Sequence, residues 1–451
     1  MIGHARLLEE LARLVKRSRA DGTSVCAHAQ MRRVSRFARD RIHQDLLQET
    51  VSLYVKVIAG GRVGVAVTDT LERTSLQRTL HAALEIARHA PPVKDLPPLP
   101  GAYQQITTHD YVAQTIQMPA QQLVGSLKRL FQLCQGAGAQ LAGSFALGED
   151  ELAVVNSNRV SCYAASTLAG VKLVTMYRKL SGFATGIHRQ LDRLDLERLL
   201  ERALKQCLHR RDPIALPTGT YEVVLEPEAV AELITWLGYI AFGAKSFQER
   251  TSFLAGRMGE RLMARAITLF DDGNHPAGLR VPFDFEGVPK QKVLLIDRGK
   301  ACGIVYDTAY GLLYNHPSTG HALPPDEVEG PLPAHLFMEP GSVRREDLIR
   351  TCNRGLLIPR FHYVNGLLNP REALMTGLTR EGAFLIEDGK LAAPITTMRF
   401  TQSLLEAFNH VTGISKERQL IADPTQDFGC AVVPTVRLGK FRITGRSEDE
   451  D

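Results

Sequence analysis

The chain has 451 residues, ordinary apolar and charged fractions for a globular protein, and a formal net charge of only +5. So small a charge on so long a chain gives no electrostatic reason to expect nucleic acid as a partner. The amino-terminal sequence lacks the apolar core of a signal peptide, and no apolar run reaches the roughly 18 residues that a membrane span needs. We therefore expect a cytoplasmic protein that binds neither nucleic acid nor membrane, and the length favours about three domains.

The cysteines are scattered singly along the chain and are odd in number. No Cys-x-x-Cys pair occurs, which argues against a disulfide framework and against a closed zinc knuckle. We expect reduced thiols at all seven positions: Cys26, Cys134, Cys162, Cys207, Cys302, Cys352 and Cys430.

The first part of the chain reads as a helix, a hairpin and a second helix. Leucines at three- and four-residue spacing predict an amphipathic helix over residues 4–20. Residues 49–58 and 62–67 alternate β-branched with other residues on either side of two glycines, which is typical of a β-hairpin. Helical spacing returns over 71–89. These elements predict an amino-terminal α/β domain over residues 1–95.

A proline-rich connector follows. Residues 91–100 contain five prolines and predict a semi-rigid extended segment, so we place the first domain boundary there. Beyond it the pattern predicts a central α/β domain over residues 105–212, with helices at 118–134 and 192–208 and strands at 140–147, 151–156 and 164–176.

The rest of the chain is rich in short strands and turns. We expect a strand-rich carboxy-terminal domain over residues 217–446, interrupted by helices near 227–244 and 344–352. Residues 447–451 form an acidic tail, which we expect to be solvated. The predicted fold class is α+β, with three domains, mixed helices and largely antiparallel sheets.

Several motifs of the carboxy-terminal region resemble the TldD/PmbA metallopeptidase family. Residues 361–400 contain a hairpin built on Asp388-Gly389 and followed by a Pro-Ile pair, and the family has a very similar run. Upstream, residues 217–225, 251–260 and 270–273 match further family motifs in the same order. Several motifs in one order are much harder to obtain by chance than any one of them.

The resemblance implies where catalytic residues should stand, and this chain lacks them there. Catalytic members carry a His-Glu-x-x-x-His motif whose histidines bind zinc and whose glutamate serves as the base. With Val223-Val224-Leu225 aligned to the family strand, that position is occupied by Thr235, Trp236 and Ile240. Neither tryptophan nor isoleucine can ligate zinc, and threonine is a poor ligand. We therefore expect no metal site and no catalytic residue of this kind in the chain.

Other candidates for chemistry are weaker. His316 and His321 are separated by a proline and a glycine, so we interpret them as neutral histidines in a loop. Cys430 lies where the family has carboxy-terminal cysteines, and we interpret it as a buried packing residue. The pair Asp271-Asp272, followed by Gly273, favours a turn over acid/base catalysis.

The pattern resembles the PmbA (TldE) branch of the family, which implies a non-catalytic subunit that pairs with a zinc-bearing TldD-type chain and acts on extended peptides only within that complex. Trp236, Leu237 and Tyr239 are then the candidate residues for contact with the partner or for lining the substrate cleft. Two alternatives stay open. The chain is a self-associating peptide-binding module, for which a homo-oligomer is expected, or it is an enzyme that uses Cys430 or the histidine loop.

Limited trypsin digestion tests the first domain boundary. The connector offers few apolar residues to bury, so we expect the first cut of the native protein at Lys94. Mass spectrometry of the early fragments identifies the site. Cleavage at Lys205 or Arg210 before Lys94 would show that the boundary is misplaced.

Overall fold

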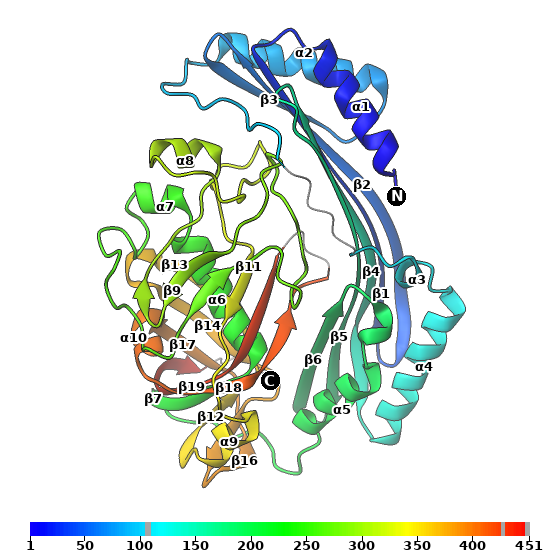
Figure 1. Ribbon diagram of the computed structural model, residues 1–451. Coiled ribbons are helices and arrows are strands. Elements are labelled where there is room, and N and C mark those ends of the chain that lie inside the picture. Colours follow the sequence, from blue (N-terminus) through cyan, green and yellow to red (C-terminus); the bar gives the residue numbers. More distant parts are fainter. Residues whose placement is uncertain (104–109, 425–428, 447–451) are drawn as a thin grey trace.

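The computed structural model describes residues 1–103, 110–424 and 429–446 and has two parts. A long, curved antiparallel sheet carries helices α1, α2 and α4 on one face, and a carboxy-terminal body lies against its other face (Figure 1). The expected start of the central domain at residue 105 and the acidic tail 447–451 lie outside the described residues. The mixed α and β architecture agrees with the predicted fold class.

The amino-terminal sheet has six strands in the order β3-β2-β1-β4-β5-β6, with every neighbouring pair antiparallel. Strand β1, which the sequence patterns did not indicate, pairs with β2 on one side and β4 on the other. It therefore joins strands of the two expected amino-terminal domains in one sheet. The strands are β1 (Gly22–Ala38), β2 (Arg41–Ala59), β3 (Arg62–Thr68), β4 (Gln140–Asn156), β5 (Ser161–Tyr177) and β6 (Leu180–His188).

Two separate apolar cores lie between this sheet and its helices. One joins α1 and α2 to β1, β2 and β3, and the other joins α4 and α5 to β4 and β5. Gly64 allows α2 to lie directly on β3, since a Cβ there would stand 2.0 Å from the carbonyl oxygen of Ala83. The helices are α1 (His4–Arg17), α2 (Arg73–His89), α3 (Ala113–Ile116), α4 (Ala120–Gly136) and α5 (Leu196–Cys207), with a 3-10 turn at Leu191–Arg193.

The turn between β4 and β5 places Arg159 in a left-handed backbone conformation. Arg159 adopts a positive φ of 69°. The side chain of Asn156 stabilises the turn, because its Oδ1 accepts hydrogen bonds from the amides of Asn158 at 2.8 Å and Val160 at 3.0 Å.

The carboxy-terminal body is built on a thirteen-stranded mixed sheet. Its main path runs β10-β9-β8-β11-β19-β7-β12-β15-β16, with β7 parallel to β12 and β11 parallel to β19. The strands are β7 (Gly219–Leu225), β8 (Leu269–Asp271), β9 (Val293–Asp297), β10 (Lys300–Ala301), β11 (His335–Met338), β12 (Arg354–Ile358), β13 (Arg360–Asn369), β14 (Leu374–Arg380), β15 (Phe384–Glu387), β16 (Lys390–Pro394), β17 (Met398–Ser403), β18 (Val411–Ile421) and β19 (Cys430–Arg446).

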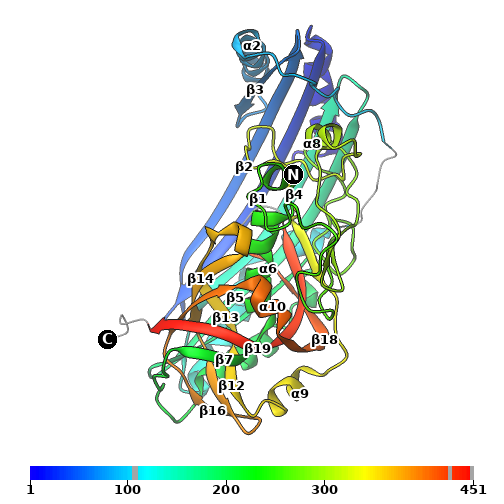
Figure 2. The same cartoon turned by 90° about the vertical axis from the view of Figure 1, so that its left-hand side faces the viewer.

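Helix α6 lies within this body and packs against β13 and β19. Figure 2 shows it among these strands, with the amino-terminal sheet behind. The hairpin predicted at Asp388-Gly389 is confirmed as the β15–β16 turn, with both residues at positive φ. The helices are α6 (Pro227–Ala241), α7 (Ala244–Gln248), α8 (Thr308–Leu313), α9 (Arg345–Arg350) and α10 (Leu404–Asn409), with a 3-10 turn at Pro370–Glu372.

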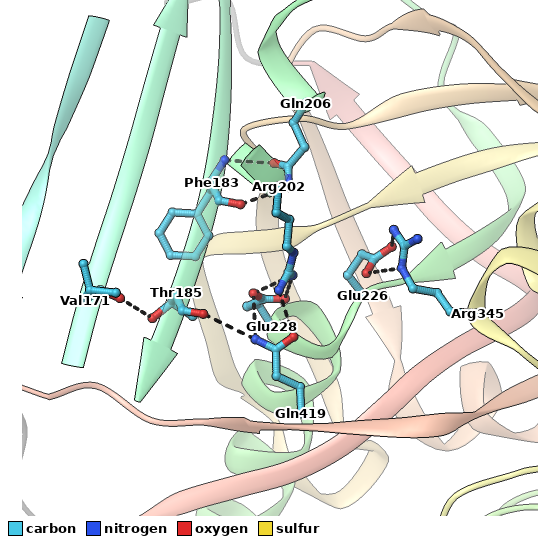
Figure 3. Close-up of polar contacts among 9 residues, drawn as sticks. All are labelled: Val171, Phe183, Thr185, Arg202, Gln206, Glu226, Glu228, Arg345 and Gln419. Carbon is cyan, nitrogen blue, oxygen red and sulfur yellow. Dashed lines mark hydrogen bonds and ion pairs between the residues drawn. The ribbon is translucent and has the colours of Figure 1, made fainter. Parts of the chain in front are cut away.

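An ion pair between half-buried Arg202 and buried Glu228 joins the start of α6 to the amino-terminal sheet (Figure 3). Arg202 on α5 donates to both carboxylate oxygens of Glu228, at 2.7 and 2.8 Å, and to Gln419 on β18 at 2.8 Å. Gln419 in turn donates to the carbonyl of Thr185 on β6 at 3.5 Å. Burial raises the pKa of Glu228, and Arg202 opposes this rise. The carboxylate therefore depends on Arg202 for its charge compensation.

Further contacts extend the seam between the two parts. Phe283 and Phe285 pack against Cys26, Leu152 and Val154 of the sheet. Arg280 donates to Asp110 through its Nε at 3.0 Å. Within the carboxy-terminal body, next to the Arg202 pair, Arg345 on α9 forms a two-bond ion pair with Glu226, the residue that precedes α6.

The sequence predicted that no segment spans a membrane and that trypsin cuts first at Lys94. Within the described ranges, no helix is both long and apolar enough to cross a membrane. Lys94, the expected trypsin site, is exposed and lies outside any helix or strand. The order of cleavage stays a prediction.

The substitution Arg202→Met tests the seam. It leaves the buried Glu228 carboxylate without its cation, so we expect the free energy of unfolding at pH 7 to fall by about 3 kcal/mol in urea titrations. Burial raises the folded-state pKa of Glu228, so the protonated carboxyl is favoured in the folded protein. This contribution to stability is present below the ordinary pKa of glutamate and is lost as the pH rises. The deficit should therefore shrink in acid.

The control is Arg198→Met, which removes an exposed arginine of the same helix and should change stability little. Adding Glu228→Gln to Arg202→Met should recover part of the loss. A pH-independent deficit of equal size in both single variants would contradict the role of the pair.

Candidate functional site

Helix α6 is apolar on nearly every side, which explains its place inside the body. Proline at its first position supplies the fixed φ of a helix start, directly after β7. Most of the helix is buried, and what remains open is one stripe at helical spacing. Glu232, Thr235 and Tyr239 are exposed, and Trp236 beside them is half-buried. The site that we consider is this stripe together with the strand next to it.

Trp236 fixes the stripe against β13. Its indole lies on the backbone of Gly366, where a Cβ would come within 2.6 Å of the ring. On the other side the ring of Tyr239 meets it edge-on, with 5.9 Å between the ring centres. This packing therefore requires glycine at position 366. The aromatic pair forms part of the open surface of α6.

Strand β13 continues the apolar surface. It pairs only with β14 among the described strands, and two irregularities interrupt that ladder. Tyr363 is 77% exposed and has a φ of +51°, which is unusual for an aromatic residue. Leu367 and Leu368 are 55% and 45% exposed. We call the set Trp236, Tyr239, Tyr363, Leu367 and Leu368 the α6–β13 surface.

Two of the three residues at the expected catalytic position lie on the open stripe of α6, and the third lies in the core. Thr235 and Trp236 belong to the open stripe, whereas Ile240 is only 4% exposed. Leu237 is fully buried and packs in the core of the body, so it cannot contact a partner as the sequence suggested. Of the three residues proposed for partner contact, Trp236 and Tyr239 are accessible.

This position does not fit a zinc ion. A zinc site needs several nitrogen, sulfur or carboxylate ligands that converge on one point. An indole and an isoleucine side chain supply none, and the threonine hydroxyl is a poor ligand. Across residues 1–103, 110–424 and 429–446, no group of three or more histidine, cysteine, aspartate or glutamate side chains could hold a metal ion.

The two loop histidines do not act together. His316 is exposed, stacks on Tyr306 and contacts the carbonyl of Pro317 through Nδ1 at 2.7 Å. His321 is buried, and its Nε2 lies 2.8 Å from the carboxylate of Asp271. Burial lowers the pKa of His321, so a neutral ring donates Nε2–H to that carboxylate. His321 is therefore a neutral histidine outside any helix or strand, as expected, but it is buried and paired with Asp271.

Asp271 is a buried structural acid rather than a surface turn residue. Besides His321, it accepts a hydrogen bond from the amide of His335 at 2.7 Å. Burial raises its pKa, but the hydrogen bond from His321 and the nearby Lys290 outweigh burial and lower the pKa. Neighbours in sequence give no sign of this pairing, since 50 positions separate Asp271 from His321.

Cys430 is buried at the start of β19, which confirms the packing interpretation. It lies in register with His335 of β11, and its Sγ accepts a hydrogen bond from the amide of Leu279 at 3.4 Å. Burial raises the pKa of the thiol to about 12, so it stays protonated and is a poor nucleophile.

Comparison with known proteins gives matches over much of the chain. Residues 218–445 match the family model described as the PmbA/TldA metallopeptidase C-terminal domain. A metalloprotease of Methanothermobacter thermautotrophicus is 22% identical over 62% of this chain and 61% of its own length. A TldD homolog of Haemophilus influenzae is 25% identical over 49% of this chain and 46% of its own length. The chain thus spans about half the length of these curated relatives.

Solved structures show the same fold over the whole chain. TldE from Thermococcus kodakarensis has a TM-score of 0.86 at 22% identity, with 98% of this chain and 99% of that chain covered. A protein from Thermotoga maritima, described as a putative modulator of DNA gyrase, has a TM-score of 0.85 at 17% identity and covers 97% and 100%. Because the family model matches more than half of the residues, the chain belongs to the TldD/PmbA metallopeptidase family.

Proposed function

We propose that this chain is a non-catalytic, PmbA/TldE-like subunit that works with a zinc-bearing TldD-type chain in the cleavage of extended peptides or peptide precursors. The observation that carries the proposal is the aromatic pair on α6, exposed Tyr239 and half-buried Trp236, beside Thr235 where catalytic relatives have ligands. Zinc is then supplied by the partner. The fold shared with TldE supports this assignment.

The chemistry of the site explains why such a chain would act by binding. A zinc protease needs a metal with an open position and a base beside it, and the open stripe of α6 has no histidine or cysteine to hold that metal. The α6–β13 surface instead presents large apolar and aromatic side chains, the types that dominate the energetics of protein interfaces. The subunit would complete the substrate cleft or hold the catalytic chain in its active form.

A self-associating peptide-binding module remains the second candidate. The irregular edge of β13 supports it, because an extended peptide can add to an unpaired strand edge through main-chain hydrogen bonds. A protein of this kind would bind peptides without any metalloprotease chain.

Reconstitution with a metal-bearing TldD-type chain distinguishes the two. We expect no peptidase activity from this chain alone, and restored or redirected cleavage on mixing. Trp236→Asp or Tyr239→Asp should weaken pairing by about 2 kcal/mol or more, because a charge would enter an apolar contact. Co-elution and peptide cleavage are the measurements.

The matched control is Leu133→Asp, which places the same charge on an exposed leucine of α4 and should leave pairing unchanged. Leu237→Asp is not a suitable test, because it would disrupt the core. Equal cleavage with and without this chain, together with no co-elution at micromolar concentration, would favour the peptide-binding module.

Metal analysis provides an independent test. We expect the purified chain to contain well under one zinc per molecule, because Thr235, Trp236 and Ile240 give no ligand set. Elemental analysis after dialysis measures this. Zinc close to one per chain that disappears in His316→Ala or His321→Ala would contradict the proposal and move the site to the histidine loop. Cys430→Ser should leave metal content unchanged.

A further inference from the structure

A pocket of about 450 Å³ lies at the seam between the two parts of the molecule. One side comes from the end of β6, the edge strand of the amino-terminal sheet that lies beside β18 (Figure 1). The other side comes from residues 276–280 and from Leu420 on β18. A pocket of this size can hold a small molecule or the end of a peptide, since small-molecule sites enclose about 300–1,000 Å³.

The pocket has more positive than negative side chains. Its described lining contains three arginines, namely Arg189 and Arg193 after β6 and Arg280 on the other side. The one carboxylate of this lining, Asp110, is paired already, because Nε of Arg280 donates to its Oδ1 at 3.0 Å. Burial lowers the pKa of His188, so this ring adds no charge at neutral pH. Three positive charges against one negative leave an excess of two, which favours an anionic ligand.

Arg189 makes hydrogen bonds only to neutral acceptors in the described part of the chain. Its Nη1 donates to Oγ of Ser166 at 2.8 Å and to the carbonyl of Thr167 at 3.3 Å, and its Nη2 donates to the carbonyl of Arg280 at 2.8 Å. Its Nε is buried and has no hydrogen-bond partner among the described residues. These bonds hold the guanidinium in place without neutralising its charge.

The two carboxylates that act most strongly on Arg189 are both engaged with other arginines. Burial lowers the pKa of Arg189, and Asp110 and Asp150 oppose this shift. Asp110 is paired with Arg280, and Asp150 is paired with Arg32, whose Nη2 lies 2.6 Å from Oδ1. Burying a positive charge is costly unless an anion compensates it. An anion in the pocket would therefore be stabilised by Arg189, and it would lower the cost of burying this arginine.

The chemistry of the lining indicates which anion fits. A guanidinium presents a planar set of donors that matches the two oxygens of a carboxylate. Because hydrogen bonds already hold Arg189 and Arg280, little side-chain entropy is lost when a ligand binds. The lining also includes apolar side chains, which would contact an apolar group next to the carboxylate. They are Val112, Ile187, Leu279 and Leu420.

We propose that this pocket binds a carboxylate with an apolar substituent, either the carboxy-terminal residue of a peptide or a free small carboxylate. Arg189 and Arg193 would bind the carboxylate, and the apolar side chains would contact the substituent. Because the lining comes from both parts of the molecule, a bound ligand would join them. None of the described lining residues belongs to the α6–β13 surface, so this site does not depend on the proposed function.

Isothermal titration calorimetry of the full chain tests this site, with N-acetyl-leucine as the probe and a buffer without other carboxylates or phosphate. We expect N-acetyl-leucine to bind, and N-acetyl-leucinamide not to bind, because it keeps the apolar group but lacks the carboxylate. Acetate, which lacks the apolar group, should bind about tenfold more weakly. Equal binding of N-acetyl-leucine and its amide, no binding of either, or inorganic phosphate bound as tightly as N-acetyl-leucine would overturn the proposal.

A short peptide that ends in leucine distinguishes the two sources of the carboxylate. If this peptide binds as tightly as N-acetyl-leucine and its carboxy-terminal amide does not bind, the pocket takes peptide ends. If N-acetyl-leucine binds and the peptide does not, the pocket takes free small carboxylates. Both results support a carboxylate site.

Arginine variants place the ligand in the pocket. Arg189→Gln and Arg193→Gln should each weaken the binding of N-acetyl-leucine by about tenfold, because each removes a charged donor. Arg193 is exposed, so its variant should fold even if Arg189→Gln does not. The control Arg198→Gln removes the same charge from an exposed position on α5 outside this lining, and it should bind as the wild type does. N-acetyl-leucine should raise the melting temperature of the wild type and of this control. Wild-type affinity in either lining variant would overturn the proposal.

Discussion

The position of α6 depends on the ion pair between Arg202 and Glu228. Burying a carboxylate is costly, and the cost is met only where a cation and further donors reach it. Here the cation comes from α5, on the amino-terminal sheet, and the carboxylate from the first turn of α6, in the carboxy-terminal body. If the two parts moved apart, both charges would lose their partner. The pair therefore ties the start of α6 to the amino-terminal sheet, and Phe283 and Phe285 add an apolar contact between the same two parts.

Once α6 is held in this way, its sequence decides what the site can do. A helix enclosed on nearly all sides has few positions left for chemistry, and here they are Glu232, Thr235, Trp236 and Tyr239. None of these four is a histidine or a cysteine, the residues that supply nitrogen and sulfur ligands to zinc. An indole resting on Gly366 instead covers the backbone of β13 and presents an apolar surface. One scaffold can therefore carry different functions, because the difference between two sites can lie in a few side chains.

The local part of this structure could be predicted from the sequence. Leucine spacing identified α1, α2, α4 and α5, and the Asp388-Gly389 and Gly60-Gly61 turns identified two hairpins. What sequence reasoning missed is non-local. Strand β1 carries polar residues and arginines in its second half because both of its faces are only partly covered there, so its alternation is weak. The pairing of Asp271 with His321, like that of Arg202 with Glu228, joins separate elements, and no local pattern encodes such partners.

The expectation for Leu237 failed for a related reason. From the sequence, Trp236, Leu237 and Tyr239 formed one apolar group, and only the helical rotation separates them. Successive residues of a helix lie about 100° apart, so Leu237 turns into the core while Trp236 and Tyr239, three positions apart, share the open face. Which face is open depends on how the body packs around α6, and this is decided by β13 and β19. An apolar cluster in a buried helix therefore indicates contact with a partner only after the packing of the whole domain has assigned each residue to the core or to the surface.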